Sequence, residues 1–123
     1  MKYGFVYVLS NASMPGLYKV GHTSGSPQAR AKALSSATGV PTPFEVVCYA
    51  EFANAQQAET YIHTLLVDMR CAKNREFFKG PLTRITDLVL ESGYSLSVSR
   101  MYVDALLYEE ATGHQDASRQ GFV

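Results

Sequence analysis

The chain has 123 residues, enough for one small domain and too few for two. Hydrophobic residues make up 46% and charged residues 18% of it, a globular composition that excludes a disordered or fibrous chain. The formal net charge is zero, and no apolar stretch approaches the roughly 20 residues of a membrane span. The first residues lack the apolar region of a signal peptide, so we expect a cytoplasmic protein. Cys48 and Cys71 have no spacing typical of a zinc site or a disulfide framework.

The first predicted elements are two short strands. Residues 3–10 are rich in β-branched and aromatic side chains, and a Pro-Gly turn separates them from a second strand at residues 17–22. The short connection predicts an antiparallel hairpin in which Tyr7 can lie beside Lys19. A lysine ammonium favours the phenolate of a neighbouring tyrosine, which would make Tyr7 a usable base. The alternative is a half-buried strand tyrosine and a surface lysine.

A helix follows the hairpin. Ser26 is suited to cap it, Pro27 suits its first position, and residues 28–36 are compatible with a helix. Arg30 lies early in this helix, one short loop beyond the hairpin, where its guanidinium could hold a phosphate oxygen. Otherwise Arg30 is a solvated helix residue. Residues 38–43 break the helix.

Residues 44–52 read as a third strand that extends the hairpin, and Asn54 can cap a second helix. Glu59 falls at the border of that helix's apolar face, where a carboxylate is costly unless it meets a cation, a donor or a metal. His63 lies on the same side and could support it. Plain solvent exposure of Glu59 is the alternative. The apolar face consists of Ala58, Tyr61, Ile62, Leu65, Leu66 and Met69.

The remaining chain predicts a short extended or turn segment at residues 74–79 and a third helix opened by Pro81 and ended by Gly93. A weaker fourth helix is predicted at residues 98–108, and the chain is polar and patternless from Thr112. We therefore expect one main domain at residues 1–92, a helical extension at 93–111 and a disordered tail at 112–123.

The charges are unevenly distributed along the chain. Residues 1–43 contain Lys2, Lys19, Arg30 and Lys32 and no acidic residue, whereas acids outnumber bases after Ile85. Such a chain can present a basic face to a polyanion although its net charge is zero. The alternative is a set of scattered, solvated charges.

Several motifs follow one another in a specific order: GFVYVLSN, MPGLYKVGHTS, the helix with Arg30 followed by SSATGVPTPF, AETYIHTLL and NREFF. From Gly4 to about Phe78 this order resembles the GIY-YIG nuclease superfamily, and most closely a single-domain branch found in phage and bacterial genomes. The resemblance implies an α+β fold with a small three-stranded antiparallel sheet flanked by helices, with one or more additional helices at the C-terminus.

The resemblance also implies a metal-dependent DNA endonuclease that uses one divalent ion, Mg²⁺ or Mn²⁺. Tyr7 would assist the attacking water, Arg30 would hold the scissile phosphate, and Glu59 would bind the metal. Many members have Tyr-Ile-Gly where this chain has Lys19-Val20-Gly21, so Lys19 would depress the pKa of Tyr7, and His22 would assist. Additional contacts with nucleic acid are expected from Lys32, Lys73, Asn74 and Arg75.

Two other classes of function fit the same residues less well. A DNA-binding or regulatory module could keep this scaffold and its phosphate contacts without cutting. A protein-interaction domain is disfavoured by the basic first third of the chain. Because net charge is zero, we expect weak DNA binding, and a homodimer or a separate DNA-targeting partner would be needed to cut both strands.

Overall fold

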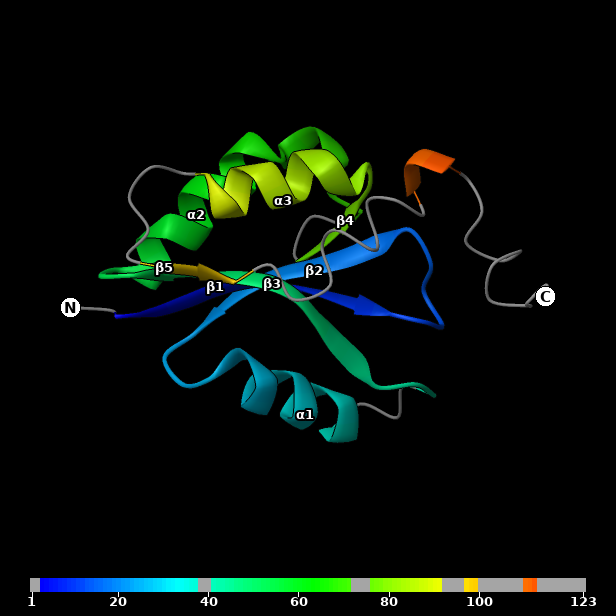
Figure 1. Cartoon of the computed structure of the whole chain (residues 1–123), viewed down its shortest axis with the longest axis horizontal. Coiled ribbons are helices and arrows are strands. Elements are labelled where there is room, and N and C mark those ends of the chain that lie inside the picture. The colour runs from blue at the N-terminus through cyan, green and yellow to red at the C-terminus, as the bar shows by residue number, and fades with distance from the viewer. Residues whose placement is uncertain (1–2, 38–40, 72–75, 92–96, 100–109, 113–123) are drawn as a thin grey trace.

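The computed structural model contains one antiparallel sheet of five strands in the order β4-β2-β1-β3-β5. It describes residues 3–37, 41–71, 76–91, 97–99 and 110–112. Helix α1 lies on one face of the sheet, and α2 and α3 lie on the other (Figure 1). The strands are β1 (Gly4–Asn11), β2 (Leu17–Thr23), β3 (Phe44–Phe52), β4 (Phe77–Lys79) and β5 (Ser97–Ser99). The helices are α1 (Pro27–Ala37), α2 (Ala55–Leu65) and α3 (Leu82–Leu90), and a short 3₁₀ turn, η1, spans Val67–Met69.

The fold class is α+β, but the expected three-stranded sheet is wrong. The three long strands form the centre of the sheet, and β4 and β5 add one short strand at each edge. Each edge strand has three residues, too few for an alternating pattern to stand out in the sequence. Residues 97–99 pair with β3, so the predicted fourth helix does not begin at Val98. The rest of that helix, Gly93 and the residues beyond Thr112 lie outside the described residues.

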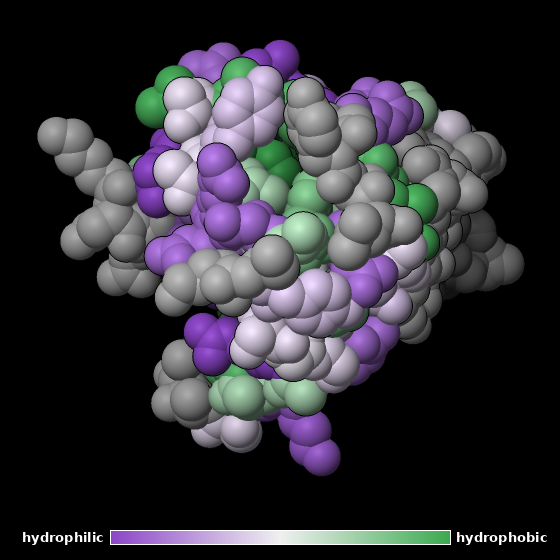
Figure 2. All heavy atoms as spheres, turned by 90° about the vertical axis from the view of Figure 1, so that its left-hand side faces the viewer, coloured by the Kyte–Doolittle hydropathy of each residue, from purple (hydrophilic) through white to green (hydrophobic). Residues whose placement is uncertain are grey.

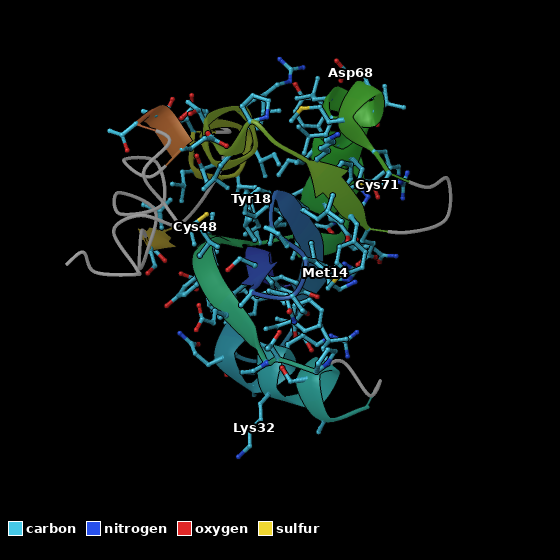
Figure 3. The ribbon with its side chains drawn as sticks, turned by 90° about the vertical axis from the view of Figure 1, so that its right-hand side faces the viewer. Met14, Tyr18, Lys32, Cys48, Asp68 and Cys71 are labelled. Atoms are coloured by element: carbon cyan, nitrogen blue, oxygen red, sulfur yellow. The ribbon has the colours of Figure 1, made fainter. Side chains whose placement is uncertain are left out.

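The β1–β2 hairpin has a different register from the one that we expected. Tyr7 pairs with Gly21, and Lys19 pairs with Leu9. The connecting turn passes Met14, labelled in Figure 3, and Gly16, whose φ of 81° is a left-handed conformation that glycine adopts at little cost. Paired residues share a face, so Tyr7, Gly21 and Lys19 all lie on the α1 side of the sheet.

The two faces of the sheet hold cores of different size. Alternate β1 residues Val6 and Val8 are fully buried in the larger core under α2 and α3, whereas Tyr7 and Leu9 belong to a smaller core under α1. The larger core also contains Ile62, Leu66, Phe78, Leu82, Ile85 and Val89, all completely buried.

Helix α2 begins at the predicted residue, but one residue of its predicted apolar face is exposed. Asn54 Oδ1 accepts a hydrogen bond from Gln57 N at 3.1 Å, which confirms the cap. Ile62 is buried, but Tyr61 is 59% exposed and does not belong to the core. Among the described helices, none is long and apolar enough to span a membrane.

Candidate active site at the edge of strand β2

The candidate site forms where β4 begins, beside the end of β2 that no described strand pairs with on that side. The last backbone contact between the two segments runs from Val20 N to the Glu76 carbonyl, at 2.9 Å. The Val20 carbonyl lies 2.8 Å from His63 Nε2, so this imidazole donates to it as an Nε2–H tautomer. His63 also packs against the Phe78 ring, with the centroids 5.0 Å apart. The side chain of His63 therefore fixes helix α2 against the sheet edge.

Glu59 lies one turn before His63 on α2 and is only 7% exposed. Its Oε1 is 2.6 Å from His22 Nδ1 on β2, and its Oε2 is 3.7 Å from His63 Nε2. Burial raises the pKa of this carboxyl, and the charge of Glu76 raises it further, while the two histidines oppose the shift. Oε2 is buried and has no hydrogen-bond partner among the described residues, which is costly for a carboxylate.

Tyr7 is almost completely buried, at 1% exposure, beneath α1. Burial raises the pKa of its hydroxyl, and a hydrogen bond from the Arg30 guanidinium only partly opposes that shift. The charges of Glu76 and Glu59 raise this pKa further. The expectation that Lys19 depresses the pKa of Tyr7 is therefore wrong, because Arg30 is the cation that meets this hydroxyl.

Lys19 is instead paired with Glu76. Its Nζ lies 3.1 Å from Glu76 Oε1 and 5.3 Å from the centre of the Phe77 ring. Glu76 also approaches Gly21: a Cβ at Gly21 would lie 2.9 Å from Glu76 Oε1 and 2.6 Å from Tyr7 Oη. Only glycine leaves room for both oxygens, so the absence of a side chain at position 21 shapes the site.

Glu76 is a site residue that the sequence pattern did not indicate. Residues 74–79 predict a short extended or turn segment anchored by its two phenylalanines, and no role for the acid between Arg75 and Phe77 follows from that pattern. Glu76 lies at the site because β4 pairs with β2. Phe77 pairs with Lys19, which brings the preceding residue, Glu76, next to the site. That pairing is long-range and cannot be read from a local pattern.

The structure brings together Tyr7, Lys19, His22, Arg30 and Glu59, but not Lys32. Arg30 and Lys32 are two residues apart on α1, which places their side chains about 200° apart around the helix. Lys32 lines a shallow hollow between α1 and β3 and points away from the sheet (Figure 3). Lys73, Asn74 and Arg75 lie outside the described residues.

A divalent ion at Glu59 is compatible with the residues present. No three His, Cys, Asp or Glu side chains in the described part of the chain are grouped to hold a metal ion. However, Mg²⁺ commonly uses one or two carboxylates and takes its other ligands from water and substrate phosphate. The unpartnered Oε2 of Glu59 is an oxygen of the type that such an ion uses.

A second hollow, with a volume of about 540 Å³, lies at the β3–α2 junction. Figure 2 faces this end of the molecule and shows apolar side chains between hydrophilic ones. Tyr61, which lines the hollow, is two residues from Glu59 and points to the other side of α2. None of the predicted site residues lines it: its walls are Phe52, Ala53, Asn54, Gln57, Ala58, Tyr61 and Ile62.

Comparison with known families identifies the chain. The model of the T5orf172 domain matches residues 4–92, well over half of the sequence, so the chain belongs to this family. Membership indicates a phage-type, DNA-associated domain. The assignment to the GIY-YIG superfamily is thereby corrected, because the matching family is a distinct one. Searches among curated proteins and among solved structures gave no significant match.

Proposed function

We propose that this T5orf172-domain protein is a metal-dependent endonuclease that hydrolyses phosphodiester bonds in DNA. The observation that carries the proposal is the Glu59 carboxylate: it is buried, its pKa is raised, and one of its oxygens has no hydrogen-bond partner in the part of the chain that the structure describes. Burying such a carboxylate costs stability unless both of its oxygens meet a cation, a donor or a metal. The groups around it are those that phosphoryl transfer requires.

Each neighbouring residue has a role in this proposal. Arg30 is exposed on α1 and would bind a non-bridging oxygen of the scissile phosphate. The Tyr7 hydroxyl would contact the attacking water. Glu59 would hold one Mg²⁺ or Mn²⁺, which when bound stabilises negative charge on the phosphate and the leaving oxygen. His22, which contacts Glu59 at 2.6 Å, would keep this carboxylate oriented.

A DNA-binding or regulatory module that does not cut is the alternative. It is favoured by the raised pKa of Tyr7, which keeps the hydroxyl protonated, and by the lack of a three-residue metal cluster among the described residues. A cytoplasmic location, and a homodimer or a separate DNA-targeting partner, stay predictions.

The test is cleavage of supercoiled plasmid and of single-stranded and branched DNA in Mg²⁺, Mn²⁺ or EDTA. Glu59→Gln keeps the shape and the His22 contact but removes the charge, so we expect cleavage to fall by at least about 100-fold. Glu45→Gln is the matched control, because Glu45 is an exposed carboxylate on β3 outside the site.

Metal-dependent nicking that Glu59→Gln loses and Glu45→Gln keeps would support the endonuclease. If the wild type cuts no substrate, while it and Glu59→Gln retard DNA equally on a gel, the endonuclease proposal is wrong. The non-cleaving module then becomes the function that the site supports.

A further inference from the structure

The Tyr7 hydroxyl needs an acceptor for its own proton if it is to take one from water. Burial raises the pKa of this hydroxyl above its ordinary 10.0, and Arg30 opposes the rise without reversing it. Tyr7 is therefore a neutral phenol at neutral pH. A neutral phenol can accept a proton from water only while it passes its own proton to another base.

The carboxylate of Glu76 lies where such a base is needed. Tyr7 Oη and Glu76 Oε1 are 2.6 Å and 2.9 Å from the point where a Gly21 Cβ would stand, so both border the same small space. The Arg30 guanidinium has only donors, so it binds the oxygen of Tyr7 and leaves the hydroxyl proton free to point elsewhere.

Two further contacts hold Glu76 in this position. Its backbone carbonyl accepts from Val20 N at 2.9 Å, and its Oε1 is 3.1 Å from Lys19 Nζ. Its side chain is 39% exposed, whereas Tyr7 is buried. A proton that reaches this carboxylate can therefore leave directly to bulk solvent, whereas the nearly buried Tyr7 hydroxyl would meet only the attacking water.

We propose that Glu76 is a positioning residue that acts through Tyr7 by accepting its hydroxyl proton during hydrolysis. As the water oxygen bonds to phosphorus, one water proton passes to Tyr7 Oη and the original hydroxyl proton passes to Glu76 Oε1. The phosphorus bond to the leaving oxygen breaks, and that oxygen takes a proton from solvent. Glu76 then releases its proton to solvent, so Tyr7 never accumulates as a phenolate. This inference rests on the proposed endonuclease function.

Other titratable or charged groups also surround this pair and must be separated from it in any pH experiment. Lys19 and His22 come from β2, Arg30 from α1, and Glu59 and His63 from α2. Comparison of variants at one position isolates Glu76, because these other groups are unchanged.

The experiment measures kcat/KM for cleavage from about pH 5 to about pH 10 in saturating Mg²⁺. We expect Glu76→Gln to lower the rate about 100-fold at neutral pH and to give a profile that keeps rising up to about pH 10, because the small phenolate fraction of Tyr7 grows with pH. Glu76→Asp keeps a carboxylate and should retain the wild-type shape at a lower rate. Glu51→Gln is the matched control, because Glu51 accepts a hydrogen bond from Tyr3 at an exposed part of the same sheet.

Mn²⁺ binding and thermal unfolding of each variant are measured in parallel. If Glu76→Gln binds Mn²⁺ as tightly as the wild type, its lower cleavage rate would be due to impaired proton transfer. If the variant binds Mn²⁺ so much more weakly that this explains the lower rate, the inference would be overturned. A fall by the same factor at every pH would mean a structural role only and would also overturn it. If the wild type cleaves and Glu76→Gln keeps its pH profile, only the role of Glu76 is lost; a wild type that cleaves no substrate removes both proposals.

Discussion

The two faces of the sheet differ in how much apolar surface they bury and in how many polar groups they hold. The face under α2 and α3 buries a continuous set of apolar side chains, with Phe78 and Ile85 fully enclosed. The face under α1 has a much smaller core, and its largest member, Tyr7, brings a hydroxyl that must be satisfied by Arg30. The difference indicates that one face mainly supplies stability, while the other and the adjoining β2 edge tolerate polar groups that stability alone would not favour.

The largest expected effect compares the two cores directly. Phe78→Ala should lower the free energy of unfolding by about 3–5 kcal/mol, since Phe78 is fully buried, whereas Leu34→Ala under α1 should cost less than about 2 kcal/mol. Urea unfolding followed by circular dichroism measures both. Equal costs would contradict the division between the two faces.

A smaller effect is expected from Gly21→Ala, which tests the crowding at the site. The added Cβ would meet Tyr7 Oη at 2.6 Å and Glu76 Oε1 at 2.9 Å, so we expect a loss of about 1–3 kcal/mol. Gly25→Ala is the control, because the nearest atom to its Cβ would be Thr23 Oγ1 at 4.0 Å. Thermal unfolding that is the same for both variants would show that the space above Gly21 is not confined.

The smallest effect, with the opposite sign, is expected from Glu59→Gln. Because burial raises the pKa of Glu59 above its ordinary 4.5, the folded state favours the protonated form. The stability that this group contributes is present below its unfolded pKa and is lost as pH rises through its folded pKa. Glu59→Gln should therefore be more stable by about 1 kcal/mol at neutral pH and about equal to the wild type near pH 4.

Thermal unfolding across this pH range measures the difference. Mg²⁺ or Mn²⁺ should raise the melting temperature of the wild type and leave that of Glu59→Gln unchanged. A variant that is less stable than the wild type at neutral pH would mean that the Glu59 carboxylate is satisfied in the folded protein.

The central elements of the fold were predictable because their signals are local. The hairpin, the third strand and the Asn54 cap follow from alternation, turn residues and capping chemistry within a few positions. The edge strands were not predictable, since β4 and β5 are stabilised by pairing with distant residues rather than by their own sequence. Tyr61 shows a similar limit: helical periodicity placed it in the core, but its side chain faces solvent.

The structure brings several of the predicted site residues together, but their contacts could not be predicted. Glu59 was expected at the margin of a buried face and lies there, with His63 beside it. Which cation meets Tyr7 depends on the register of the hairpin, which differs from the predicted one, so that Arg30 rather than Lys19 meets the hydroxyl. Ion pairs between distant segments depend on the tertiary structure. The pairing of Lys19 with Glu76 therefore could not be predicted from the sequence of either segment alone.

The short length of β4 has a consequence for how the protein behaves at high concentration. Among the described residues, no strand pairs with residues 21–23 of β2 on the side where β4 lies. An uncovered edge offers backbone groups that a strand from another molecule can join, which is a common route to aggregation. Here the stretch is short, and His22 and the Lys19–Glu76 pair border it with polar groups. The shortness of this stretch and its polar neighbours therefore disfavour self-association.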